Sequence, residues 1–142
     1  MRYLIILLFV ISCSSPIQAQ NKIQNLTDNN TVNSLVKYGL NELEINDIHI
    51  TILPLSNYYK KIKAMAGSKP WGVTMSGNKH TYTIIISLRH ESDIGISFKE
   101  RVAHELIHVY QSYYSIDCVE NCEKQAYNKQ SELANQITDR IL

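Results

Sequence analysis

The sequence is short of cysteine and of net charge. Its 142 residues include three cysteines, too few for a miniprotein held together by a framework of disulfides. Its 14 basic and 13 acidic residues give a formal net charge of +1. There is therefore no basic excess to bind the phosphates of a nucleic acid, and we expect no nucleic-acid partner.

The sequence also has no internal repeat and no low-complexity segment. Its composition is that of a globular protein. Apolar residues make up 44% of the chain, which is ordinary for a folded domain and too high for a disordered one. The length allows one domain and leaves no room for two of full size.

The N-terminal residues have the pattern of an export signal. Arg2 precedes an apolar run at residues 4–11, and small polar residues and Pro16 follow it. The run is too short for a membrane span, which needs about 20 residues. We expect residues 1–19 to be a signal peptide and the protein to act outside the bacterial cytoplasm.

Two processing sites compete within this signal. Val10-Ile11-Ser12-Cys13 resembles a lipobox, so Cys13 would carry lipid and anchor the protein to a membrane. Cleavage after Ala19 would instead release a soluble protein. In both cases Arg2 is removed, which leaves equal numbers of acidic and basic residues in the mature chain. We expect membrane contact only through the lipid anchor, and charge-driven partners become still less favoured.

Hydrophobic spacing divides the remainder of the chain. Residues 20–30 are polar, which predicts a linker, and residues 31–142 are predicted to form the folded domain. Periodicity predicts helices at 31–44, 58–65, 97–114 and from about 123 to 141, and strands at 48–53, 71–75 and 82–88. The last two strands, joined by a turn, predict a hairpin. The expected fold class is α+β, with about three antiparallel strands.

The strongest motif is His104-Glu105-Leu106-Ile107-His108, an H-E-x-x-H pattern inside the helix predicted at 97–114. Residues four apart lie on one helical face, so the two imidazoles can converge on one metal ion. Glu105 flanks that face and can take a proton from a water whose pKa the ion lowers to about 7. The pattern therefore predicts a zinc site and hydrolysis of a peptide carbonyl.

A catalytic zinc needs a third protein ligand and an open position. Glu123 lies at the start of the last predicted helix, and Ala126 one turn later would let that helix pack closely on the motif helix. Glu120 is a competing choice, and Glu132 lies farther along. Glu123 is the preferred third ligand.

At this point the sequence resembles the zincin metallopeptidases with a glutamate third ligand, in their compact bacterial form. The resemblance rests on residues 102–111 and 123–127. It implies zinc ligands at His104, His108 and Glu123, with Glu105 as general base. It also implies that an edge strand, 82–88 or 71–75, aligns the substrate peptide.

The chain departs from that family in several ways. The spacing from His108 to Glu123 is short, and no separate substrate domain is apparent. Tyr114 stands where a third histidine ligand would fall, which disfavours the zincins with three histidines. No residue is assigned to stabilise the transition state, for which Tyr127, Tyr110 and His80 are the candidates.

Cys118 and Cys122 lie between the two proposed metal-site helices. Outside the cytoplasm a disulfide is favoured. Because a disulfide is shorter than the i,i+4 spacing of an ideal helix, the pairing predicts a turn at 118–122. Such a bond would fix the direction in which the last helix starts. A thiolate pair holding a metal is the rival interpretation.

The function expected from the sequence is an exported zinc peptidase acting on a peptide or protein substrate. One alternative is a zincin-shaped binding or assembly protein that holds zinc without turnover. The other is a cell-wall amide hydrolase, which would use the same chemistry on another amide. An open groove along an edge strand would favour the enzyme, and a closed site would favour the binding protein.

Overall fold

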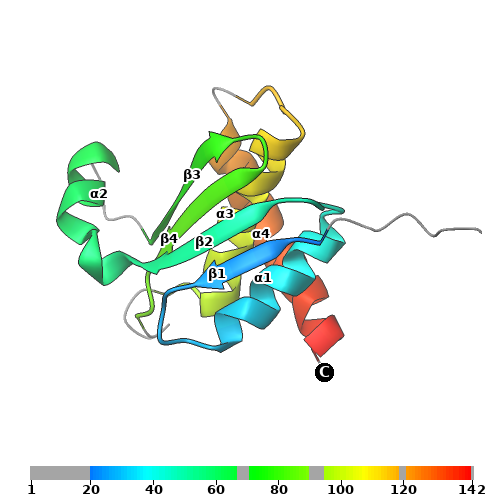
Figure 1. Ribbon diagram of the computed structural model, residues 1–142, viewed down its shortest axis with the longest axis horizontal. Coiled ribbons are helices and arrows are strands. Elements are labelled where there is room, and N and C mark those ends of the chain that lie inside the picture. The colour runs from blue at the N-terminus through cyan, green and yellow to red at the C-terminus, as the bar shows by residue number, and fades with distance from the viewer. Residues whose placement is uncertain (1–19, 67–70, 90–94, 119–120, 142) are drawn as a thin grey trace, which may run out of the picture.

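The computed structural model of the protein describes residues 20–66, 71–89, 95–118 and 121–141. The predicted signal peptide, including Cys13, lies outside these residues. The described elements, in chain order, are β1 (Lys22–Asn25), α1 (Thr31–Glu42), β2 (His49–Pro54), the short 3-10 helix η1 (Leu55–Asn57), α2 (Tyr59–Ala66), β3 (Gly72–Asn78), β4 (Thr81–Ile86), α3 (Phe98–Tyr113) and α4 (Cys122–Ile141) (Figure 1). The predicted α+β class is confirmed.

The four strands form one mixed sheet in the order β1-β2-β4-β3. The predicted hairpin is confirmed, since β3 pairs antiparallel with β4. The prediction of about three antiparallel strands is wrong, because β2 pairs parallel with both β1 and β4. Parallel neighbours require a crossover connection, and α1 supplies the one between β1 and β2. Alternation of residue types marks each strand but does not encode the order of distant strands.

The predicted linker at residues 20–30 is also wrong in part, because residues 22–25 form the edge strand β1. The Asn21 side chain holds this segment beside β2. Its Nδ2 donates to the Ile45 carbonyl oxygen over 2.7 Å, and its Oδ1 accepts from the Ile48 amide over 3.1 Å. Ile23 packs against the main core. One apolar residue among polar neighbours is sufficient for an edge strand but too weak a pattern to predict one.

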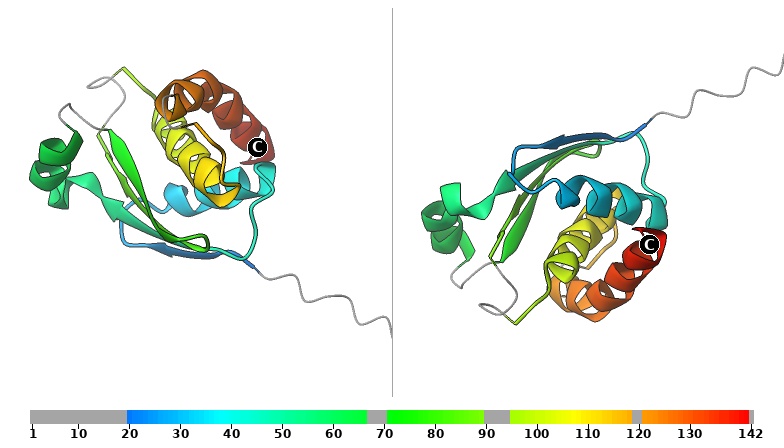
Figure 2. Two further views of the ribbon diagram at one scale, coloured as in Figure 1. Left: turned by 90° about the horizontal axis from the view of Figure 1, so that it is seen from above. Right: turned by 90° about the horizontal axis from the view of Figure 1, so that it is seen from below.

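Helices α1, α3 and α4 cover one face of the sheet, and α2 lies apart from them (Figure 2). The main core joins the three helices to the inner sheet face, where Ile50, Ile52, Tyr82, Ile84 and Ile86 are each at most 2% exposed. A smaller cluster lies on the outer face, where Ile62 of α2 packs with Leu55 and Ile85. Within the described part of the chain, no helix has both the length and the apolar character needed to cross a membrane.

The helix that carries the metal-binding motif starts at a defined point. The Ser97 hydroxyl accepts from the Glu100 amide, and the Glu100 carboxylate accepts from the Ser97 amide, which confirms the predicted capping box. Glu100 also accepts a hydrogen bond from Ser131 on α4, at 2.7 Å. The cap therefore fixes both the start of α3 and its position against α4.

Candidate metal centre

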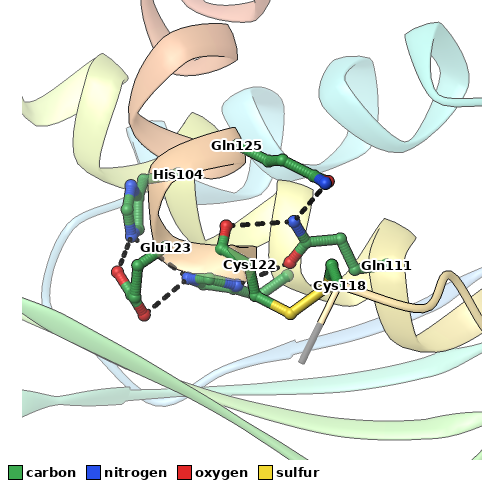
Figure 3. Close-up of a disulfide and its surroundings, with 7 residues drawn as sticks. His104, Gln111, Cys118, Cys122, Glu123 and Gln125 are labelled. Atoms are coloured by element: carbon green, nitrogen blue, oxygen red, sulfur yellow. Dashed lines mark hydrogen bonds and ion pairs between the residues drawn. A yellow bond between two sulfur atoms is a disulfide. The ribbon is translucent and has the colours of Figure 1, made fainter. Parts of the chain in front are cut away.

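His104, His108 and Glu123 meet in a group that could hold a metal ion, with their ligand atoms all within 4.8 Å of one another. The Nε2 atoms of the two histidines are 3.1 Å apart. Glu123 approaches with Oε2 at 3.3 Å from His104 Nε2 and with Oε1 at 3.2 Å from His108 Nε2 (Figure 3). The structure thus brings together the three residues that the sequence predicted as metal ligands.

The side chains of the group differ in exposure, which gives the site an open side. The histidine side chains are 13% and 17% exposed, and the Glu123 side chain is 71% exposed. The histidines come from the α3 face that packs toward α4, and Glu123 comes from the first turn of α4. The buried Ala126 confirms the predicted close packing of this turn.

Gln111 determines which nitrogen of His108 faces the group. The Gln111 Nε2 donates to the Cys122 carbonyl oxygen at 3.1 Å, so its Oε1 must be the atom that faces His108 Nδ1 at 2.8 Å (Figure 3). The Nδ1 atom therefore carries the proton, and in the neutral ring the Nε2 lone pair points into the group. Gln111 is 6% exposed, so this link between α3 and α4 is protected from water.

His104 has the equivalent arrangement with Gln130, whose Oε1 lies 2.9 Å from Nδ1. Burial and the neighbouring His108 lower the pKa of His104 below its usual value, which favours the neutral ring. Two imidazole lone pairs and a carboxylate then face one another with no proton donor between them. This acceptor-only set suits a cation.

Glu105 lies beside the group and is not part of it. Its side chain is 4% exposed, and Oε2 accepts a 2.6 Å hydrogen bond from the Thr74 hydroxyl on β3. Burial raises the pKa of Glu105 to about 8, against the lowering effect of Thr74 and with a further rise from the Glu123 charge. A nearby cation would favour the ionised carboxylate.

Gly72 makes room for the buried carboxylate of Glu105. A Cβ added at Gly72 would overlap Glu105 Oε1 and would lie 2.7 Å from Cδ and 2.9 Å from Cγ. The two residues are therefore matched: β3 approaches α3 closely because it has no side chain at this position.

This fit leads to a prediction for the conservative change Gly72→Ala. The new methyl group must displace the Glu105 carboxylate, so we expect kcat of any reaction that depends on Glu105 to fall by about 10²-fold, as for a misplacement of about 1 Å. Metal binding should stay unchanged, because the atoms nearest the new methyl group all belong to Glu105, which is not part of the group. Gly77→Ala in the same strand is the control, since its Cβ would meet Thr81 atoms only at 3.7 Å or more. Equal activity of the two variants would contradict this role of Gly72.

A disulfide joins Cys118 to Cys122, as predicted, with Cα atoms 4.8 Å apart. The Asn121 amide donates to the Cys118 carbonyl oxygen, which closes a turn immediately before α4. Cys122 is the first residue of α4 and the acceptor for Gln111. The bond therefore lies one residue from Glu123 and constrains the start of the helix from which Glu123 projects.

The metal-binding group opens into a cleft of about 730 Å³ between β3 and the helices α3 and α4. The cleft is lined on the strand side by Gly72, Val73, Thr74 and Ser76, and on the helix side by residues that include Glu105 and Tyr127. The Tyr127 residue is 53% exposed, and its ring centroid lies 4.7 Å from that of His104. Of the three candidates for stabilising a transition state, Tyr127 is the one that lines this cleft.

The remaining candidates are His80 and Tyr110 for stabilising a transition state, and Glu120 and Glu132 for the third ligand. His80 contacts the Asp47 carbonyl oxygen and Tyr113, away from the cleft. Tyr110 and Glu132 line a different depression between α1, α3 and α4. Glu120 lies outside the described residues. The positions of Glu132 and Glu123 therefore favour Glu123 as the third member of the group.

Sequence reasoning missed the residues that support the site. Gln111 follows His108 by three residues, or one helical turn, and that spacing is a usable signal. Gln130 carries no comparable signal, because it contacts His104 from another helix. Thr74 and Gly72 come from a strand, and only the fold connects them to Glu105.

No family model matches the sequence, and no curated protein matches it. Among solved structures, the chain is similar to the solution structure of TM1509 from Thermotoga maritima, described as VT1, a NESGC target protein. The TM-score is 0.57 at 13% sequence identity, over 85% of this chain and 91% of that chain. At this identity the likeness shows a shared fold alone.

Proposed function

We propose that the protein is a zinc-dependent peptidase that acts outside the bacterial cytoplasm. The observation that carries the proposal is the convergence of His104, His108 and Glu123 beside the buried Glu105. Ligand atoms at about 2.0–2.1 Å from a tetrahedral zinc lie about 3.3 Å from one another. The two Nε2 atoms, 3.1 Å apart, are close to that value, and each lies near one oxygen of the Glu123 carboxylate, His104 Nε2 at 3.3 Å from Oε2 and His108 Nε2 at 3.2 Å from Oε1.

The residues around the group suit hydrolysis. Bound zinc would lower the pKa of a water to about 7 and polarise a carbonyl. Glu105, held by Thr74, would accept the proton from the attacking water and pass it to the leaving amine. The exposed side of Glu123 leaves space for substrate.

The sheet edge supports a peptide as substrate. β3 is the last strand in the sheet order, and β4 is its one pairing partner among the described strands. Its other edge borders the cleft, where free backbone groups can pair with an extended peptide. This role falls to β3, because β4 is paired on both sides. The open cleft favours the enzyme over a zinc-holding binding protein.

Metal removal tests the proposal. We expect the purified protein to cleave an unstructured, fluorescently labelled protein substrate, and a chelator followed by dialysis to remove this activity. Adding back about one equivalent of zinc should restore it, because the site holds one ion. Activity that persists after the metal has been shown to be absent would contradict a metal-dependent reaction.

A further inference from the structure

The net charge is only +1, but the acidic and basic residues are unevenly distributed along the chain. Residues 48–90 contain no aspartate or glutamate. The same segment contains the basic residues Lys60, Lys61, Lys63, Lys69, Lys79 and Arg89. All the acidic residues therefore lie before or after it in the sequence, and β1 and the helices α1, α3 and α4 come from those flanking parts of the chain.

The described residues of this segment form neighbouring elements of the fold. Residues 48–89 build β2, η1, α2, β3 and β4. Helix α2 projects from the body of the protein beyond the end of β2 (Figure 1). Ile62 packs inward on the outer sheet face, so Lys60, Lys61 and Lys63 are left exposed. A helix with three exposed lysines thus belongs to a stretch of sequence, residues 48–90, that has no carboxylate side chain.

A second cleft lies between this helix and the sheet. It has a volume of about 500 Å³ and is lined by apolar and aromatic side chains, among them Leu55, Tyr59, Trp71 and Leu88, together with Arg89. Trp71 lines both this cleft and the metal cleft, so the two are neighbours. The Ser87 amide donates to the Trp71 carbonyl oxygen at 2.8 Å, which holds Trp71 at the start of β3.

A peptide paired with the edge of β3 would connect the two clefts. Gly72 and Thr74 lie against Glu105, so the peptide bond next to the metal group would lie near this end of β3. The next substrate residues in the direction of Trp71 would leave the strand and meet the second cleft. Tyr59 of α2 lines this cleft together with Arg89, and the same helix carries the three exposed lysines. A cleft with apolar walls and cations beside it suits an apolar side chain that is flanked by carboxylates.

We propose that the second cleft and the lysines of α2 form a subsite for an acidic segment of the peptide substrate. The inference rests on the proposed peptidase function and names the class of peptide that the site prefers. Each exposed charge contributes little, but several together can raise affinity by about tenfold at low salt. The preference should weaken as salt rises, since the Debye length is about 8 Å at 0.15 M ionic strength.

Three labelled peptides test the proposal. They share one apolar core and carry flanks of glutamate, glutamine or lysine on both sides. Binding to the zinc-loaded protein is measured by fluorescence anisotropy, and cleavage is measured separately. We expect the glutamate-flanked peptide to bind about tenfold more tightly than the glutamine-flanked peptide at low salt, with lysine flanks weakest. Equal binding of all three peptides would overturn the subsite.

Charge reversal locates the preference on the molecule. The double substitution Lys60→Glu and Lys63→Glu should abolish the preference for glutamate flanks. Lys37→Glu with Lys129→Glu, on α1 and α4, makes the same change in charge and should retain it. Loss of the preference in both variants, or in neither, would contradict a subsite at α2.

The two assays separate failure of the subsite from failure of the proposed function. Cleavage of all three peptides at equal rates, with equal binding, would leave a peptidase without this subsite. Selective binding of the acidic peptide without cleavage would retain the subsite and remove the peptidase function. If the protein binds anionic vesicles or an RNA oligomer but discriminates none of the peptides, the basic surface has a different partner and the proposal is wrong.

Discussion

Replacing Glu105 with glutamine is expected to lower kcat for peptide hydrolysis by about 10²–10⁴-fold, the usual contribution of a positioned general base. Glutamine has the same shape, and its amide oxygen can accept the Thr74 hydrogen bond that Glu105 now accepts. It has no group that can take a proton from the attacking water. Because Glu105 is not one of the grouped ligands, the variant should keep about one zinc per chain.

The control for this substitution is Glu132→Gln. Glu132 is an exposed glutamate on α4 that lines a different depression, so its loss removes the same charge without touching the cleft. We expect this variant to keep full activity. Activity retained in the Glu105 variant at the level of this control would contradict the assigned role of general base.

Replacing His108 with alanine is expected to abolish stoichiometric metal binding. The change removes one of three ligands and also leaves Gln111, whose Oε1 lies 2.8 Å from His108 Nδ1, without its partner. Loss of a supporting hydrogen bond alone commonly costs 10–100-fold in metal affinity, and loss of a ligand should cost more. After dialysis, the variant should hold less than about a tenth of the zinc of the wild type.

His49→Ala is the matched control for this experiment. His49 is an exposed histidine at the start of β2, outside the metal-binding group. Metal analysis of the two variants and the wild type, combined with thermal melting to show that each is folded, checks the result. Equal zinc in the His108 and His49 variants would show that the metal binds elsewhere.

The parts of the fold that local pattern encodes were predictable. The capping box at Ser97 and Glu100 marked the start of α3, and the apolar runs on either side of residues 76–79 marked the hairpin. The grouping of His104, His108 and Glu123 was also predictable, since the i,i+4 histidines lie on one helical face and Glu123 lies in the first turn of the next helix. In each case the information lies within a few residues of sequence.

The other features of the fold and the site depend on contacts between segments that are distant in the sequence. The strand β1 forms because Asn21 bonds to residues 45 and 48 and pairs the segment with β2, so its own composition did not reveal it. The mixed strand order follows from packing all three large helices on one face of the sheet. Thr74 and Gly72 reach Glu105 only after β3 is placed against α3.

The net charge of the sequence also does not show how charged residues are distributed over the surface. The balance of acidic and basic residues argued against a charge-driven partner, yet residues 48–90 contain no acidic residue at all. A net charge near zero excludes a strong electrostatic potential over the whole molecule, but it does not exclude a strong local potential. Lys60, Lys61 and Lys63 become a feature of the surface only because Ile62 packs inward.

The central claim is that His104, His108 and Glu123 hold the zinc ion on which hydrolysis depends. Crystals of the protein with zinc, measured on both sides of the zinc absorption edge, test it most directly. The account predicts one strong anomalous peak at about 2.0–2.2 Å from both Nε2 atoms and from a Glu123 carboxylate oxygen. A peak at other residues, or no peak in the cleft at full zinc loading, would contradict it.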